Sequence, residues 1–311
     1  MLLRRKLLTA SAISLTTPAI VLRSSLGQTR RRVKIGSAFT TTTNAAFLMP
    51  DILKAEGIDA EIVTFPSLVQ RMQAVASGDV DVGNGGLSAT MQIAVKGFPM
   101  SVLANGCDGG WMLLAKPEIR NFAALRGKKI AVQNGSIGLV SLAWKLKQEG
   151  LEGAVELVYM DNQDQPIPLM RGDVSAICCF EPYCTLAELQ GWGHKLWVPY
   201  DTPMGKTNLG FVASVPFIRN NPDLVRSVVR AHVRATNEMK NNPAIAIQTT
   251  IQQFRMSREV AEASTRNLFF SADSGQAFQD GLKALAGMMI EQNLLERQPD
   301  WAEFINTSFL T

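Results

Sequence analysis

Residues 78–88 read GDVDVGNGGLS, and residues 172–182 read GDVSAICCFEP, so one phrase occurs twice in the chain. In each copy a Gly-Asp turn leads into an apolar stretch, Val80–Val82 or Val174–Phe180, that ends in a glycine-rich or polar corner. A buried parallel strand meets its loop in this way. A helix-like segment precedes each copy. The repetition predicts that two halves of the chain share one α/β plan.

The segments around each copy follow the same order of strand and helix patterns. The first half reads as a strand at 33–39, a helix that stops at Gly57, a strand at 59–65 and a helix at about 67–77. The second half repeats this order between residues 125 and 180. After a further strand pattern, NLGFVAS, the rest of the chain carries the apolar stripes of amphipathic helices.

The composition is that of a soluble globular protein. The chain has 311 residues, of which 46% are hydrophobic and 19% charged, and this length suits two α/β units of ordinary size. Residues 1–27 hold four basic residues and no acidic ones, so 31 Lys and Arg against 27 Asp and Glu become 27 against 27. Without an excess of positive charge, the remaining chain is not expected to bind nucleic acid.

Residues 1–27 have the pattern of an export signal peptide. The basic triplet RRK at 4–6 precedes a moderately apolar run over 7–22, and small residues follow near Gly27. The arginine pair and the modest hydrophobicity favour a twin-arginine signal over a Sec signal. A membrane anchor is the alternative, but Pro18 interrupts the short apolar run. We expect cleavage near Gly27 and a periplasmic location.

The four cysteines are expected to be buried thiols. An oxidising periplasm would permit disulfides, but Cys178 and Cys179 are adjacent in a strand and point to opposite faces. Their spacing with Cys184 and His194 does not fit a structural zinc site. A single bridge that involves Cys107 or Cys184 stays open.

Together these motifs resemble the solute-binding proteins of ABC importers in the nitrate, sulfonate, taurine and pyrimidine-precursor family. The resemblance rests on SGDVDVGNGG, LRGKKIAVQNGS, RGDVSAICCFEPY and LGFVASVPFIRNNPDLV, in this order. It implies an α/β, two-lobed type II periplasmic-binding fold with two crossover hinge segments and a helical C-terminal part. One lobe would comprise residues 31–113 plus 207–311 and the other residues 114–206, with crossings near 112–118 and 200–208.

The resemblance also implies how such a protein works. The protein would trap a small-molecule solute between its lobes and deliver it to an ABC permease in the inner membrane. It would act as a monomer, would need no cofactor or metal, and would not catalyse a reaction. A periplasmic sensor subunit that hands its solute to a membrane receptor would use the same binding physics.

Four corners at strand ends are candidates for the solute site, because ligands of open α/β sheets lie beyond the carboxyl ends of strands. They are residues 37–44, 85–88, 134–138 and 180–183. Two of the corners, NGGLS and NGSIG, place glycines and a serine where a helix begins and where free N–H groups can bind oxygen atoms, although ordinary caps and turns are the alternative. The predicted ligand-binding residues are Ser37, Phe39, Thr40, Asn44, Gly86, Leu87, Ser88, Trp111, Asn134, Gly135, Ser136, Phe180, Glu181, Tyr183 and Asn208.

The corner FEPY indicates a class of solute. Pro182 fixes the chain just past a strand and would present Glu181 at the rim, beside aromatic surface from Phe180 and Tyr183. A solvated glutamate is the alternative. Trp111 would be either a stacking wall or a core residue of the crossover.

The four corners contain no Lys or Arg, which a nitrate or sulfonate site would be expected to place around its oxygens. Lys128 and Lys129 lie at the wrong end of their strand. The preferred solute is therefore a planar, neutral or amine-bearing heterocycle such as a pyrimidine precursor. An alkanesulfonate, taurine or nitrate-like anion is the alternative.

An enzyme is not expected, because the chain lacks a P-loop, a His-Glu-x-x-His motif and a Gly-x-Gly-x-x-Gly motif. NGSIG is not a nucleophile elbow, since Asn134 replaces the first glycine. His194 and His232 are expected to be surface or packed residues. The alternative is a pyrimidine-precursor synthase of the same fold, but that enzyme is cytosolic and the export signal argues against it.

The export route can be tested at Arg4 and Arg5. Replacing both by Lys should leave precursor in the cytoplasm, because the twin-arginine route reads this pair. Fractionation and immunoblotting measure the distribution. Normal periplasmic accumulation of the variant would instead show that the Sec route suffices.

Overall fold

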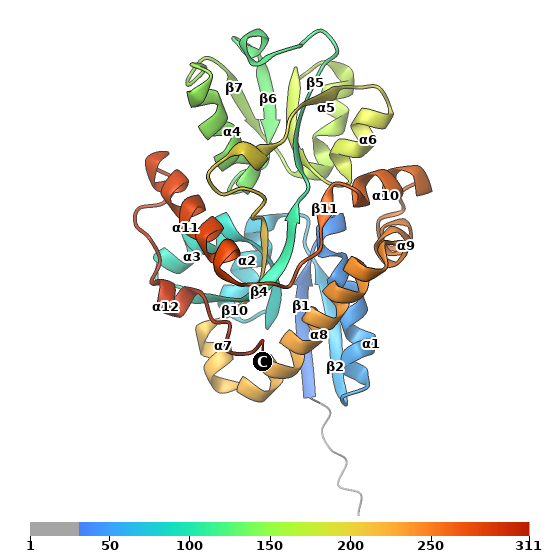
Figure 1. Ribbon diagram of the computed structural model, residues 1–311, viewed down its shortest axis with the longest axis vertical. Coiled ribbons are helices and arrows are strands. Elements are labelled where there is room, and N and C mark those ends of the chain that lie inside the picture. The colour runs from blue at the N-terminus through green and yellow to red at the C-terminus, as the bar shows by residue number, and fades with distance from the viewer. Residues whose placement is uncertain (1–30, 311) are drawn as a thin grey trace, which may run out of the picture. The chain divides into compact units, whose positions relative to one another are not determined.

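A computed structural model describes residues 31–310, and the expected export signal lies outside the described residues. The described chain forms two β-sheets with helices on their faces (Figure 1). The first sheet has the strand order β11-β4-β10-β3-β1-β2 and the second the order β7-β6-β8-β5-β9. The two-lobed α/β fold predicted from the sequence is confirmed. Within residues 31–310 no helix combines the length and the apolar character that a membrane crossing requires.

The first lobe combines the N-terminal and C-terminal parts of the described chain. Its strands are β1 (Arg31–Ser37), β2 (Ile58–Thr64), β3 (Val82–Gly86), β4 (Met100–Gly109), β10 (Leu209–Ser214) and β11 (Leu268–Phe269). Its first helices are η1 (Thr41–Leu48), α1 (Met49–Lys54), α2 (Leu68–Ser77) and α3 (Leu87–Val95). The C-terminal helices are α7 (Val215–Asn220), α8 (Pro222–Asn241), α9 (Pro243–Phe254), α10 (Arg258–Thr265), α11 (Gln276–Glu291) and α12 (Trp301–Phe304).

The second lobe is built from the middle of the chain. Its strands are β5 (Trp111–Ala115), β6 (Lys129–Val132), β7 (Glu156–Tyr159), β8 (Ala176–Phe180) and β9 (His194–Trp197). Its helices are η2 (Phe122–Leu125), α4 (Ile137–Gln148), η3 (Asn162–Asp164), α5 (Pro166–Arg171), α6 (Tyr183–Leu189) and η4 (Pro199–Asp201). Parallel pairs β1–β2, β1–β3, β6–β7 and β6–β8 give both lobes the same internal plan.

The repeated Gly-Asp phrase performs the same task in each lobe. Gly78 ends α2 with a φ of 86°, and Gly172 ends α5 with a φ of 87°. This left-handed conformation costs glycine little and turns the chain sharply out of a helix. In each lobe the strand that follows pairs in parallel with the first parallel strand of that lobe, β1 or β6. The shared plan predicted from the two copies is confirmed.

The chain leaves the first sheet at two glycines. Gly109 and Gly110 have φ values of 74° and 86°, and they separate β4 from β5. The boundary that we expected at residue 113 therefore lies inside β5, a strand of the second sheet. The polar and glycine-rich stretch NGCDGG at 105–110, which leads directly into β5, marks this crossing in the sequence. The return crossing lies between β9 and β10, and the Gly109 N–H donates to the Lys206 carbonyl at 2.9 Å, which joins the two crossings.

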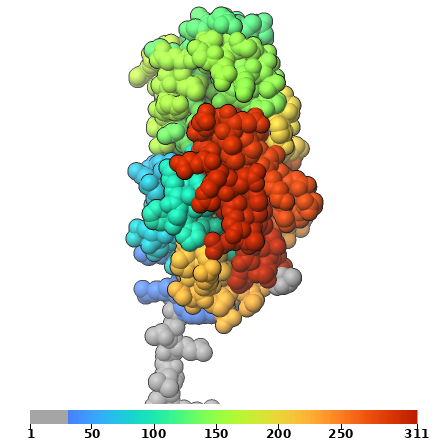
Figure 2. Space-filling view, turned by 90° about the vertical axis from the view of Figure 1, so that its left-hand side faces the viewer, coloured from blue at the N-terminus to red at the C-terminus, as the bar shows by residue number. Residues whose placement is uncertain are grey.

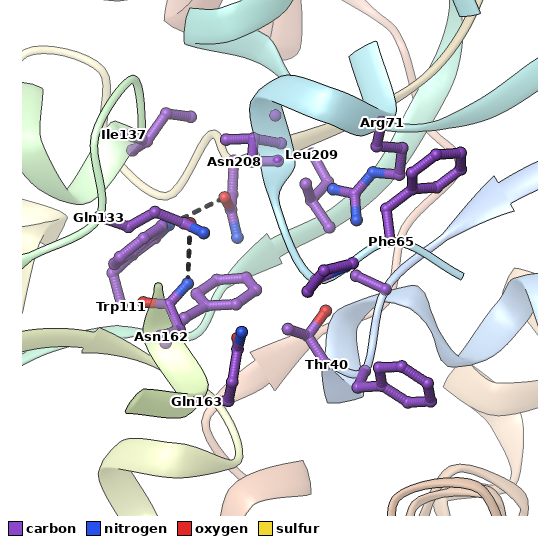
Figure 3. A pocket seen from close by; sticks show the side chains of 16 residues that line it. Thr40, Phe65, Arg71, Trp111, Gln133, Ile137, Asn162, Gln163, Asn208 and Leu209 are labelled. Carbon is purple, nitrogen blue, oxygen red and sulfur yellow. Dashed lines mark hydrogen bonds between the residues drawn. The ribbon is translucent and has the colours of Figure 1, made fainter. Parts of the chain in front are cut away.

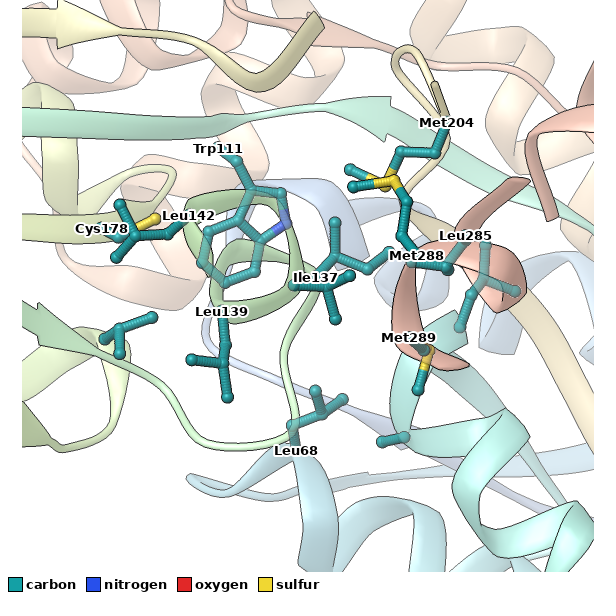
Figure 4. Close-up of a cluster of buried hydrophobic side chains, with 14 of the residues drawn as sticks. Leu68, Trp111, Ile137, Leu139, Leu142, Cys178, Met204, Leu285, Met288 and Met289 are labelled. Atoms are coloured by element: carbon teal, nitrogen blue, oxygen red, sulfur yellow. The ribbon is translucent and has the colours of Figure 1, made fainter. Parts of the chain in front are cut away.

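One buried apolar cluster continues from the first lobe into the second. Trp111 lies in this cluster together with Ile137 and Leu142 of α4, Met204 of the return crossing and Met288 of α11 (Figure 4). Helix α11 contacts both α3 and α4. In Figure 2 the C-terminal residues, in red, cover the junction with the green residues of the second lobe. The two lobes thus share packed side chains on this side.

All four cysteines are buried and unpaired, as the sequence analysis expected. Cys178 belongs to the cluster that spans the two lobes, and Cys179 belongs to a separate cluster of the second lobe. The opposite directions of these neighbours follow from strand geometry. The bridge through Cys107 or Cys184 that the sequence left open is not formed.

Packing of α11 against the return crossing can be tested at Gly281. A Cβ there would clash with the Thr207 hydroxyl and lie 3.0 Å from the Thr207 Cβ and 3.2 Å from the Met204 carbonyl oxygen. Gly281→Ala should lower the melting temperature, because overpacking costs about 1–3 kcal/mol and the gain in helix propensity is about 1 kcal/mol.

Gly287 in the same helix is the matched control, because a Cβ there meets nothing within 4 Å. Gly287→Ala should raise the melting temperature, since Ala is favoured over Gly by about 0.5–1 kcal/mol in a helix. Calorimetric melts of both variants decide the point, and equal shifts at the two positions would contradict the packing argument.

Candidate functional site

A cavity lies between the two lobes (Figure 3). Its lining follows the carboxyl ends of parallel strands from both sheets. The first lobe contributes residues just after β1 and β2 and at the end of β3, and the second contributes residues just after β6 and β7 and at the end of β8. Ligand sites of open α/β sheets occupy this position.

Some of the predicted residues line this cavity, namely Phe39, Thr40, Gly86, Trp111, Phe180 and Asn208. Their contact with a solute stays a prediction. Trp111 is only 5% exposed, and a Cβ at Gly138 would clash with its ring. The Phe180 ring lies 4.7 Å from it between centroids. Trp111 is therefore mainly a core residue of the crossover whose edge reaches the cavity, as one of the two alternatives held.

Other predicted residues lie inside the first lobe, away from the cavity. Ser37 and Leu87 are fully buried. The Asn44 amide donates to the Ala246 carbonyl at 2.9 Å and to the Thr250 hydroxyl at 2.8 Å, which fastens η1 to α9. The polar run after β1 is thus partly used for packing between helices, which the sequence pattern could not distinguish from a binding loop.

Another group of predicted residues joins the lobes to each other. The Ser88 hydroxyl donates to the Gly135 carbonyl at 2.8 Å, beside Asn134. The Tyr183 hydroxyl donates to the Phe39 carbonyl, also at 2.8 Å. Ser136 caps α4, because its hydroxyl accepts from the Leu139 N–H at 3.1 Å. The residues of this group that do not line the cavity are Ser88, Asn134, Gly135, Ser136 and Tyr183.

The expectation that Glu181 stands at the rim is wrong. Its side chain is 0% exposed and folds back onto the start of α6. The carboxylate accepts from the Thr185 hydroxyl at 2.7 Å, the Thr185 N–H at 3.2 Å and the Asn267 amide at 2.5 Å. Burial raises the pKa of Glu181, and these donors oppose that shift. Because Asn267 comes from the first lobe, Glu181 is a structural contact between lobes.

The sequence analysis missed Arg71, the only charged side chain in the lining. Arg71 lies on α2 and is 4% exposed, and its stem packs against Gly36 of β1, where a Cβ would lie 3.3 Å from the Arg71 Cγ. Arg71 is spaced with Leu68, Met72 and Val75 so that all four lie on the buried face of the helix. This spacing is the feature of the sequence that could have indicated a buried arginine.

The Arg71 guanidinium has no partner among residues 31–310. Its Nε is buried without a hydrogen bond, and no ion pair or hydrogen bond engages the terminal nitrogens. Burial lowers its pKa to about 10, so the group stays positively charged at neutral pH. Figure 3 shows the guanidinium directed toward the cavity. A buried charge without a partner is costly, which makes this group the strongest indication of what the cavity binds.

The side-chain amides in the cavity mostly bond to the protein itself. The Gln133 amide donates to the Asp161 carboxylate at 3.0 Å, and the Asn162 amide donates to the Gln133 carbonyl oxygen at 2.9 Å. The Asn208 carbonyl oxygen accepts from the Trp111 indole N–H at 3.0 Å. These bonds fix the shape of the cavity wall.

Neither histidine of the chain lines the cavity. His194 lies in β9, at the outer edge of the second sheet. His232 lies in α8, where its ring stacks on Phe211 at 4.3 Å and burial lowers its pKa to about 4. The cavity therefore has no histidine for a reaction that would use one.

Comparison with known proteins gives a consistent result. The model of the family described as NMT1/THI5 like matches residues 53–246, more than half of the chain. The putative aliphatic sulfonates-binding protein of Escherichia coli (strain K12) is 25% identical over 238 residues, which cover 72% of this chain and 70% of that protein. The taurine-binding periplasmic protein of the same strain is 27% identical over 198 residues, 62% of this chain and 61% of that protein.

A solved structure supports the same fold. The alkanesulfonate-binding protein of Xanthomonas axonopodis pv. citri, solved with bound MOPS, has a TM-score of 0.77 and 20% identity. The similarity covers 88% of this chain and 97% of that chain.

The structural role of Glu181 can be tested with Glu181→Gln. The amide would turn an N–H₂ group toward the donors of Thr185 or Asn267, so we expect a loss of about 1–3 kcal/mol in stability. Affinity for the solute should change by less than about threefold. A lost contact with the solute that contributed about 1.4 kcal/mol of binding free energy would instead weaken binding about tenfold. Thermal melts and calorimetric titration measure the two effects.

The matched control is Glu188→Gln in α6, the helix that begins just after Glu181, where the half-buried carboxylate has no hydrogen bond among the described residues. It should leave both quantities unchanged. A Glu181→Gln protein that melts normally but binds its solute tenfold more weakly would show that this carboxylate reaches the solute.

Proposed function

We propose that this chain, which belongs to the NMT1/THI5-like family, is the exported solute-binding protein of an ABC importer and that its solute is a small organic anion. Family membership follows from the match over residues 53–246. Relatives with names that refer to aliphatic sulfonates and to taurine support the class of solute. The name of the taurine-binding relative also supports a periplasmic location.

The observation that carries the proposal is the unpartnered Arg71 in a cavity whose lining contains no Asp or Glu. A buried guanidinium needs a negative charge, and a planar fork of N–H donors matches the oxygens of a sulfonate or carboxylate. Because the described residues supply no such partner, an anionic group of the solute is the natural one.

The anion replaces the amine-bearing heterocycle that the sequence favoured. That interpretation depended on the absence of a cation from four strand-end corners and on Glu181 at the rim. Arg71 supplies the cation from a helix face instead of a corner, and the Glu181 carboxylate is occupied by Thr185 and Asn267. A positively charged amine would meet repulsion from Arg71 and no carboxylate in the lining.

Capture of the solute would use both lobes. Arg71, Thr40 and the aromatic residues after β1 and β2 belong to the first lobe, while Gln133, Asn162 and Phe180 belong to the second. A solute that contacts both sets favours the closed arrangement, because only that arrangement makes all contacts at once. The closed protein would then present the solute to its permease.

The proposal is tested with Arg71→Met, which keeps the packed stem and removes the charge. Affinity for an anionic solute should fall roughly 10- to 150-fold, since a hydrogen bond to a charged group contributes about 1.5–3 kcal/mol. Arg71→Lys should lose less, because it keeps the charge but not the planar fork. Calorimetric titration with ethanesulfonate, propanesulfonate, taurine, nitrate and a pyrimidine precursor measures these affinities.

The control is Arg258→Met in α10, where the side chain is 69% exposed and pairs with Glu262. It should bind like the wild type. The empty Arg71→Met protein should melt at the same or a higher temperature, because an unpaired buried charge is removed. A pyrimidine precursor that binds the wild type and Arg71→Met equally well, with no anion bound, would disprove the proposal.

A further inference from the structure

We propose that the solute is a monoanion whose remaining part carries no ammonium group, and that Gln163 is the position that sets this limit. The inference rests on the proposed function, because it concerns the same cavity. It goes further by excluding zwitterions and dianions, two classes of small anion that would also be attracted to Arg71.

The charges around the cavity allow only one negative charge on the solute. Arg71 is the one charged side chain in the lining. A dianion would neutralise it and leave a second negative charge in a partly dehydrated site, where an unpaired charge is costly. Most of the remaining lining is apolar, including Phe65, Leu68, Ile137 and Leu209. The cavity thus matches one anionic group and an uncharged remainder.

An ammonium group would find no countercharge in the lining, which contains no Asp or Glu. It carries three N–H donors and a positive charge, and neutral oxygen atoms can receive the donors but cannot balance the charge. The Asn208 carbonyl oxygen already accepts one hydrogen bond from Trp111, and the Gln133 carbonyl oxygen accepts one from Asn162. The Asn162 carbonyl oxygen accepts a longer bond of 3.4 Å from Gln165. Asp161, next to the cavity, already accepts from Gln133.

Gln163 is the exception among the amides of the lining. It is half-buried in η3, and no hydrogen bond of its side chain is found within residues 31–310. In Figure 3 it lies on the opposite side of the cavity from Arg71, so it faces the part of a solute that points away from the guanidinium. Its amide oxygen can accept hydrogen bonds but carries no negative charge, so it cannot balance an ammonium group. A carboxylate here would supply the missing countercharge.

The experiment compares propanesulfonate with taurine, which have the same anionic group and chain length and differ in a methyl against an ammonium group. Calorimetric titration of the wild-type protein should give at least tenfold tighter binding of propanesulfonate. Methanesulfonate should likewise bind more tightly than sulfate. If the site prefers a carboxylate, butyrate against β-alanine is the equivalent pair.

Gln163→Glu should reduce the preference for the uncharged tail by at least tenfold, because it adds a carboxylate of the same size opposite Arg71. Gln163→Leu is the control that removes the amide without adding charge, and it should keep the wild-type preference. Thermal melts of both variants establish that they are folded. A loss of preference in the Leu variant equal to that in the Glu variant would contradict the role of charge at this position.

The outcomes separate this inference from the proposed function. Taurine that binds the wild type as tightly as propanesulfonate, in a manner that depends on Arg71, would overturn the inference and leave the anion proposal standing. Sulfate that binds more tightly than methanesulfonate would do the same. Failure of every anion to bind in an Arg71-dependent way would disprove the proposed function and the inference with it.

Discussion

Asn208 ties together the two places where the chain passes between the sheets. Its carbonyl oxygen accepts from the Trp111 indole at the start of the second sheet, and its amide donates at 2.6 Å to the Gly109 carbonyl at the end of the first. Asn208 itself immediately precedes β10 on the return crossing. One side chain therefore fixes both crossings and also forms part of the cavity wall. This junction, together with the Ser88–Gly135 and Tyr183–Phe39 hydrogen bonds, fixes how the two halves of the cavity lining face each other.

Regular patterning made the fold predictable from the sequence. The paired Gly78 and Gly172 turns, the apolar strands after them and the helix periods all depend on local chemistry that a single sequence displays. The first crossing was placed too late, although the polar stretch NGCDGG at 105–110, which ends in Gly109 and Gly110, comes directly before β5. Their positive φ values are visible in the structure, whereas the sequence shows only two glycines.

The site was harder to predict, because the fate of a polar side chain depends on neighbours far away in the chain. Glu181 looked accessible beside Pro182, yet Asn267, 86 residues further on, supplies one of its donors. Asn44 is taken by Ala246 and Thr250 in the same way. The helical spacing of the apolar residues around Arg71 indicated that this side chain is buried. Burial alone does not indicate a function, and only the structure shows that no described carboxylate pairs with the guanidinium.

The contrast between Glu181 and Arg71 explains how a cleft can be both rigid and selective. Both side chains are buried and ionisable, but three protein donors satisfy Glu181, whereas no described group satisfies Arg71. A satisfied polar group specifies a structure, because moving it leaves donors without acceptors. The Arg71 charge has no partner among the described residues, so it can pair with a negatively charged group that enters the cavity. Since the amides of Gln133, Asn162 and Asn208 are engaged by the protein, the proposed selectivity depends on the Arg71 guanidinium, on the uncharged Gln163 opposite it and on the shape of the wall.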